Sequence, residues 1–126
     1  MNYKISVTKT LKYLEKMSKN RINFMFREWN CYMRFAEYGN GRRAIQLMDV
    51  DTHEPIATAT VNLVDEPIFH DNMIYIKDYS ENHGMLKALQ GAGIVHYLYD
   101  VRVGMTVAHA CNLLVDEYGN SLVPQE

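Results

Sequence analysis

The first part of the chain places apolar and basic residues at the spacing of an amphipathic helix. Val7, Leu11 and Leu14 recur every three to four residues, which puts their side chains on one face of a helix. Four lysines fall together on the opposite face. We therefore predict a helix over residues 7–19, and its basic face consists of Lys9, Lys12, Lys16 and Lys19.

From residue 31 onward the pattern becomes the alternation that is typical of β-strands. Cys31–Tyr38 and Arg42–Val50 are separated by a Gly-Asn-Gly sequence, and Asn-Gly supplies the positive φ angles of a tight hairpin turn. The β-branched run Ile56–Val64 predicts a third strand, and Met73–Lys77 predicts a short fourth one. Together these segments predict an antiparallel meander, with the core of the sheet over residues 31–77.

After the meander a short helical pattern returns. Ser80 or Asn82 is expected to cap a helix over about residues 82–91, and residues 94–114 predict a C-terminal hairpin. The predicted fold class is α+β. It has an N-terminal amphipathic helix, an antiparallel sheet of five to six strands, and one short helix before the last hairpin, all in a single domain.

Composition agrees with one globular domain. The chain has 126 residues, of which 48% are hydrophobic and 22% are charged, and this excludes a disordered polypeptide. Neither a signal peptide nor an apolar run long enough for a membrane helix is expected. Cys31 and Cys111 do not form a disulfide framework, so we expect reduced thiols and a cytoplasmic protein.

The net charge of −2 conceals an uneven distribution. Residues 1–43 hold ten Lys or Arg and three acids, whereas residues 49–81 hold eight acids and one lysine. The two segments either face each other, within one molecule or across a homo-oligomer, or they expose a basic face to a partner. The sequence leaves both interpretations open.

Aromatic and basic residues are interleaved over residues 21–38. Aromatic rings can stack on bases and arginines can bind phosphates, so this mixture would suit single-stranded nucleic acid. The alternative is a strand whose aromatic side chains fill the core while its arginines face water. The candidate partner- or nucleic-acid-binding residues are Lys9, Lys12, Lys16, Lys19, Arg21, Arg27, Trp29, Arg34, Arg42 and Arg43.

Two further groups of polar residues are candidate sites. Lys77, Tyr79, Ser80 and Asn82 lie where a strand leads into a helix, a junction that either binds an anion or caps the helix. The last hairpin contains His96, His109 and Cys111, and a turn with residue 102 opposite residue 105 would place His96 opposite Cys111.

A Cys–His pair can act as a nucleophile or as half of a zinc site, but the sequence offers no third partner and favours a buried cysteine with a hydrogen-bonded histidine. The chain has no nucleotide-binding loop, no hydrolase or protease motif and no Cys-x-x-Cys. We therefore predict no catalytic residue, no metal and no cofactor.

Several sequences in the middle of the chain resemble those of a known family. They are YGNGRRAIQLMD, ATATVNL, DEP and IYIKDYSENHGMLKALQGAGIV, and together they cover about residues 38–95. They resemble a family of small uncharacterised proteins carried by bacterial phages, plasmids and other mobile elements. The resemblance implies a compact β-rich domain with one helix after KDYSEN, and it implies no catalytic residue.

Three functions follow as hypotheses. The first is a non-enzymatic binding protein that inhibits a bacterial defence complex, of the anti-CRISPR or anti-restriction type. The second is a nucleic-acid-binding accessory protein that uses the basic N-terminal third. The third is a small-ligand sponge, or an enzyme that uses the histidines and cysteine of the last hairpin, and a homodimer is compatible with each.

Overall fold

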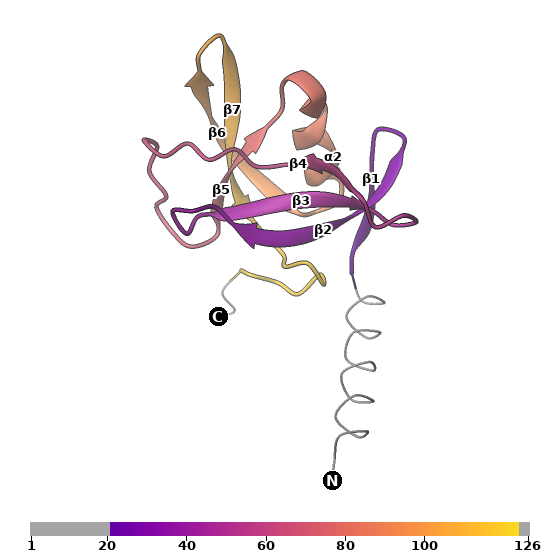
Figure 1. Cartoon of the computed structure of the whole chain (residues 1–126). Helices are drawn as coiled ribbons and strands as arrows, with labels where there is room; N and C mark the ends of the chain where they lie inside the picture. Colours follow the sequence, from indigo (N-terminus) through magenta and orange to yellow (C-terminus); the bar gives the residue numbers. More distant parts are fainter. Residues whose placement is uncertain (1–20, 124–126) are drawn as a thin grey trace.

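The computed structural model describes residues 21–123, which form mainly antiparallel β-structure with one short α-helix (Figure 1). The helix predicted over residues 7–19, with Lys9, Lys12, Lys16 and Lys19, lies outside the described residues. In the described part, the α+β class is confirmed only in this coarse form.

Four strands form the first sheet. They are β1 (Asn23–Phe26), β2 (Trp29–Glu37), β3 (Arg43–Asp49) and β4 (Pro55–Thr58), and they pair in chain order with each neighbour antiparallel. The predicted meander is therefore confirmed for β2, β3 and the start of the third strand.

Strand β1 is absent from the prediction. Its phenylalanines belong to the stretch in which aromatic and basic residues are interleaved, and that mixture hides the two-residue period. In the structure Phe24 and Phe26 are buried, whereas Met25 between them is exposed. These two aromatic side chains thus belong to the core.

The remaining strands form a second sheet. They are β5 (Met73–Lys77), β6 (Val95–Val103) and β7 (Thr106–Leu113), arranged in the order β5-β7-β6. The prediction of one five- to six-stranded sheet is therefore wrong, because the described strands divide into a sheet of four and a sheet of three. The C-terminal hairpin predicted over residues 94–114 is confirmed as β6 and β7.

The two sheets are joined where the chain leaves β4. The backbone N–H of Ala59 donates to Ile45 in β3, at 2.8 Å, while the carbonyl of Ala59 accepts from Lys77 in β5, at 2.9 Å. Thr60 bridges to Ile76, and its hydroxyl accepts from the N–H of Ile45. The chain thus changes partner from β3 to β5 within three residues, which ends the third strand well before the predicted Val64.

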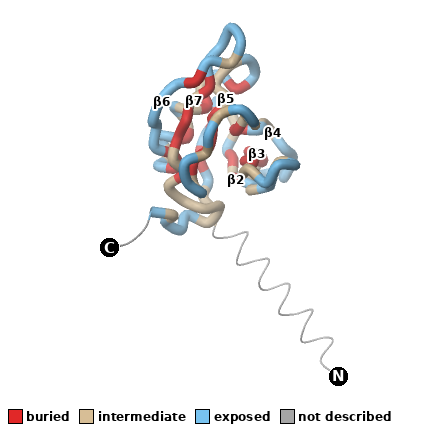
Figure 2. The backbone as a smooth tube through the Cα atoms, turned by 90° about the vertical axis from the view of Figure 1, so that its left-hand side faces the viewer, coloured by how far each residue is buried: buried red, intermediate tan, exposed pale blue. Residues whose placement is uncertain are grey.

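One core fills the space between the two sheets. Met33 and Leu47 from the first sheet meet Ile76 and Cys111 from the second, and all four are fully buried. Leu89 is contributed by α2 (Met85–Gly91), which packs against β1, β5 and β6. In Figure 2 the buried positions form a continuous interior, while loops and hairpin ends are exposed.

Helix α2 is capped by a residue outside the predicted pair. A 3₁₀ turn, η1 (Ser80–Asn82), precedes the helix, and neither Ser80 nor Asn82 caps it. Instead Asp78 Oδ1 accepts from the backbone N–H groups of Gly84, at 2.6 Å, and Met85, at 3.1 Å. The carboxylate satisfies two donors that the helix itself leaves unpaired.

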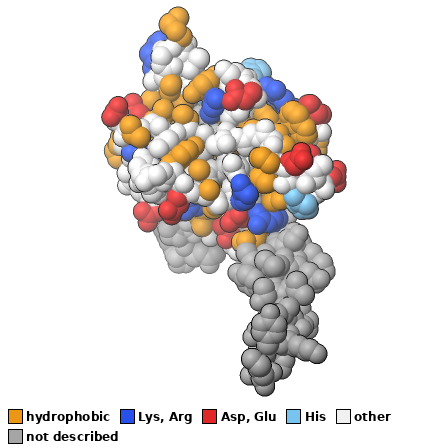
Figure 3. Space-filling model, in the orientation of Figure 1, with side chains coloured by type: hydrophobic (Ala, Val, Ile, Leu, Met, Phe, Trp, Pro, Cys, Tyr) orange, Lys and Arg blue, Asp and Glu red, His pale blue; other side chains and the backbone are white. Residues whose placement is uncertain are grey.

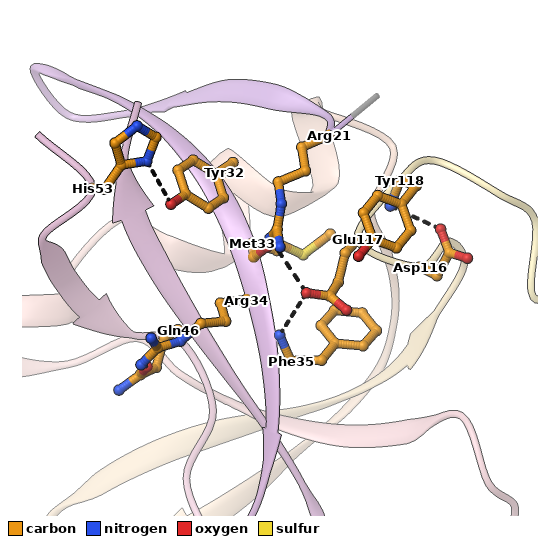
Figure 4. A network of polar contacts seen from close by, with 10 residues as sticks. All are labelled: Arg21, Tyr32, Met33, Arg34, Phe35, Gln46, His53, Asp116, Glu117 and Tyr118. Atoms are coloured by element: carbon orange, nitrogen blue, oxygen red, sulfur yellow. Dashed lines mark hydrogen bonds and ion pairs between the residues drawn. The ribbon is translucent and has the colours of Figure 1, made fainter. Parts of the chain in front are cut away.

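Side chains take the place of a strand at the far edge of β2 (Figure 4). β1 pairs with β2 only as far as Tyr32. Beyond it, Arg21 Nη1 donates to the carbonyl of Met33, at 2.8 Å, and Glu117 Oε2 accepts from the N–H of Phe35, at 3.1 Å. Arg21 and Glu117 also form an ion pair of 3.4 Å, so they cover an edge that would otherwise be open.

We expect Thr60→Val to destabilise the protein. The change keeps the shape of this buried side chain but leaves the N–H of Ile45 without its acceptor. A buried donor without a partner costs about 1–3 kcal/mol, which urea unfolding will measure. Tyr38→Phe is the matched control, because it removes only the 2.9 Å bond between the Tyr38 and Thr60 hydroxyls. Equal losses in the two variants would contradict the role given to Thr60.

Candidate functional site

The β6–β7 hairpin projects from the body of the fold, at the top of Figure 1. Met105 at its tip is 97% exposed. Hydrophobic side chains reach solvent at this end of the molecule (Figure 3), and four more on the two strands are over a third exposed, namely Tyr97, Leu98, Tyr99 and Val107. Exposed apolar side chains gathered on one projection are typical of an interaction surface.

A chain of polar contacts holds the hairpin at its base. His109 on β7 faces Asp100 on β6, with 2.5 Å between Nδ1 and Oδ1. Its other ring nitrogen, Nε2, lies 3.5 Å from Oδ2 of Asp78, the residue that caps α2. The Tyr97 hydroxyl donates to Asp100, at 2.9 Å, and the Tyr97 ring meets the His109 ring edge-on. The hairpin is thereby tied to the start of α2.

The electrostatics of this cluster follow from its hydrogen bonds. Bonds from His109 and then from Tyr97 hold the pKa of Asp100 below its usual range. The same bond to Asp100 raises the pKa of the Tyr97 phenol. Because a carboxylate faces each ring nitrogen of His109, neither nitrogen is directed at open space where a substrate would bind.

The predicted pairing of His96 with Cys111 is wrong. The turn lies one residue later than predicted, with Val103 opposite Thr106, and a β-bulge between Tyr97 and Tyr99 reverses only half of the resulting shift in register. His96 therefore lies opposite Asn112, and Tyr97 lies opposite Cys111. Cys111 is fully buried, and this burial raises the pKa of its thiol to about 12. A thiol held in its protonated form in the core is a poor nucleophile.

Three residues of this cluster lie outside the sequence prediction: Asp78, Tyr97 and Asp100. Tyr97 lies beyond the bulge in β6, and Asp78 follows a strand that pairs with β7, and neither the bulge nor that pairing has a local signal in the sequence. The one signal that could have found the cluster is the pairing of Asp100 with His109 across the two strands. It appears when the β6–β7 turn is placed one residue later, with residue 103 opposite residue 106 instead of 102 opposite 105.

The candidate residues near β1 make contacts within the protein. Arg27 donates through Nε and Nη2 to the carbonyl of His83, at 3.2 and 3.0 Å. Trp29 is half-buried and stacks on Phe26, with 6.3 Å between ring centroids. Arg21 is the residue that pairs with Glu117 beside β2.

The other predicted arginines lie around β2 and β3. Arg34 is exposed and donates to the side chain of Gln46. Arg42 donates to two main-chain carbonyls of the loop before β5. Arg43 lies over the ring of Phe35, with 4.9 Å from Cζ to the ring centroid. The described arginines are thus distributed over separate elements, and most serve contacts of the fold.

The polar junction after β5 does not gather its four candidates around one point. The ammonium of Lys77 pairs with Glu81, at 2.6 Å, and lies over the ring of Tyr79. Asn82 is buried and donates to the carbonyl of Thr58, at 2.6 Å. Ser80 is exposed and occupies a turn with φ of 55°.

No family model, no curated protein and no solved structure matches this chain. Within residues 21–123, no group of three or more His, Cys, Asp or Glu side chains is placed to hold a metal ion. The same part of the chain contains no helix that is both long and apolar enough to cross a membrane.

We expect Asp100→Asn to flatten the dependence of stability on pH in the acid range. A carboxyl whose pKa is lowered on folding stabilises the protein above its unfolded pKa of about 3.9, and this stabilisation is lost as the pH falls through the folded value. Urea unfolding at a series of pH values between neutral and strongly acidic will measure it. Asp65→Asn, in an exposed loop, is the control and should leave the profile unchanged. Parallel profiles for wild type and Asp100→Asn would contradict the assignment.

Proposed function

We propose that the protein is a non-enzymatic binding protein that docks onto a protein partner through the β6–β7 hairpin. The observation that carries this proposal is the exposure of Met105 at the tip, together with the apolar side chains on the two strands below it. Burying such side chains against a partner removes apolar surface from water, at about 25 cal/mol for each Å².

The edge of β6 offers a second kind of contact. Within the described residues β6 pairs only with β7, so the main-chain groups along its outer edge have no strand beside them. An extended segment of a partner can add to such an edge through main-chain hydrogen bonds, while side chains of the host strand select the sequence. Leu98 and Tyr99 lie along this strand and supply that selectivity.

The cluster at the base of the hairpin supports a docking role. Because His109 joins Asp100 to Asp78, the hairpin is fixed against α2 before any partner arrives. A surface that is already ordered loses less conformational entropy when it binds. The same contacts occupy both nitrogens of His109, which favours binding over catalysis as the function.

The resemblance of residues 38–95 to small proteins of phages, plasmids and other mobile elements suggests the class of partner. We propose a bacterial defence complex, of the CRISPR or restriction type, which the protein would inhibit in the cytoplasm by occupying one of its surfaces. The absence of any recognisable catalytic motif in the sequence supports inhibition by binding.

The test is a comparison of two single variants. Met105→Glu places a charge at the hairpin tip, where an apolar pocket of the partner would close over it, and we expect partner capture to fall at least about tenfold. Met25→Glu is the matched control, because Met25 is also exposed but lies on β1. Tagged proteins are incubated with bacterial lysate, with and without nuclease treatment, and the captured proteins are quantified by mass spectrometry.

We expect the partner that the wild-type protein captures to be lost from Met105→Glu and retained by Met25→Glu. Equal capture by both variants would contradict docking through the hairpin. Capture that disappears with nuclease treatment would instead favour the nucleic-acid hypothesis and its basic residues.

A further inference from the structure

A cavity of about 470 Å³ lies between the β2–β3 turn and the loop before β5, on other residues than those of the hairpin tip. The β2–β3 turn forms one wall and the loop before β5 forms the other, and the two lie side by side in Figure 1. The amide of Asn40 donates to the side chain of Asn62, at 3.1 Å, and fastens the walls together. This volume lies in the range of about 300–1,000 Å³ that is typical of small-molecule sites.

The inner surface of the cavity is apolar and aromatic. Met73 and Tyr75 on β5 are buried and line it, and the half-buried Phe35 on β2 is also one of its lining residues. The Tyr75 hydroxyl donates to the carbonyl of Pro67, so the ring is held in place. A flat ring of a ligand would find aromatic partners here for stacking or edge-on contact.

Two arginines bring positive charge to this apolar surface. Arg42 is fixed by the carbonyls of Leu63, at 2.6 Å, and Glu66, at 2.7 Å, which satisfy donors but do not neutralise the charge. Arg43 lies over the Phe35 ring. In the described part of the chain, neither guanidinium forms an ion pair with a carboxylate.

The acidic residues of the cavity are placed differently. Glu37 and Asp71 are exposed, whereas Arg42 and Arg43 are half-buried. Water and salt screen charges at the rim more effectively than charges set deeper. The side of the cavity formed by Arg43 therefore favours a negative charge next to the Phe35 ring, whereas at Tyr75 the negative charge of Glu66 has a larger effect than the positive charge of Arg42.

We propose that this cavity binds a small aromatic anion, meaning an aromatic ring that carries a carboxylate or phosphate group. The ring packs against Phe35, Met73 and Tyr75, and the anionic group accepts from the guanidinium of Arg43 and the free donors of Arg42. This site is distinct from the hairpin tip, because its lining residues lie on β2, β3, β5 and the loop before β5.

The test uses three probes of one shape and different charge. Naphthoate, naphthalenemethanol and naphthalenemethylammonium, all of the same isomer, are titrated into the full-length protein and followed by amide chemical shifts. Naphthoate is expected to cause saturable shifts in the residues that line the cavity. A hydrogen bond to a charged group contributes about 1.5–3 kcal/mol, so the alcohol and the ammonium should bind at least about tenfold more weakly.

Two arginine variants locate the site. Arg43→Gln should weaken naphthoate binding about tenfold or more, while Arg102→Gln, an exposed arginine on β6, should leave it unchanged. The comparison of the three probes on the wild-type chain stands even if Arg43→Gln fails to fold. Absence of saturable shifts, equal affinity for the three probes, shifts confined to other surfaces, or unchanged binding in a folded Arg43→Gln would each overturn the proposal.

Discussion

The segment from Ala59 to Val61 is the joint on which both sheets depend. Ala59 gives its N–H to β3 and its carbonyl to β5, and Val61 donates to Tyr75 in β5, so this three-residue segment joins the two hydrogen-bonded networks. After Ala59 the main chain turns away from β3, and the Thr60 hydroxyl accepts a hydrogen bond from the backbone N–H of Ile45 in β3. Buried main-chain groups need hydrogen-bond partners, and here a side chain provides the acceptor that the main chain of the departing strand no longer provides.

A polar side chain also supplies a partner for main-chain groups at three other places in the fold. Asn82 donates to the last carbonyl of β4, Asp78 accepts at the start of α2, and Glu117 covers the edge of β2. These polar side chains let the strands change direction without exposing their backbone in the core. Polar contacts of His109 fix the base of the β6–β7 hairpin, while its tip extends beyond them. The cavity lies between two loops that the Asn40–Asn62 hydrogen bond holds together.

Local turn chemistry made part of this fold predictable, whereas its long-range pairings have no sequence signal. The Asn-Gly turn and the β-branched residues identify β2, β3 and the C-terminal hairpin, because these depend on neighbours in the chain. The division into two sheets depends on Ala59 and Thr60, which look like any other strand residues. The position of the β6–β7 turn sets Asp100 opposite His109, and the pairing of β5 with β7 brings Asp78 near the same ring, so the Asp78–His109–Asp100 contacts could not be found without the structure.

Hydrogen exchange tests the role of the joint most directly. If Ala59–Val61 holds both sheets in one cooperative unit, the amides of Ala59, Val61 and Lys77 exchange only when the whole protein unfolds. Their free energies of exchange should then equal the free energy of unfolding measured with urea, while the amide of Asp65, in an exposed loop, exchanges fast. Exchange of the three joint amides through a local opening, with a much lower free energy while β2 and β3 stay protected, would contradict this account.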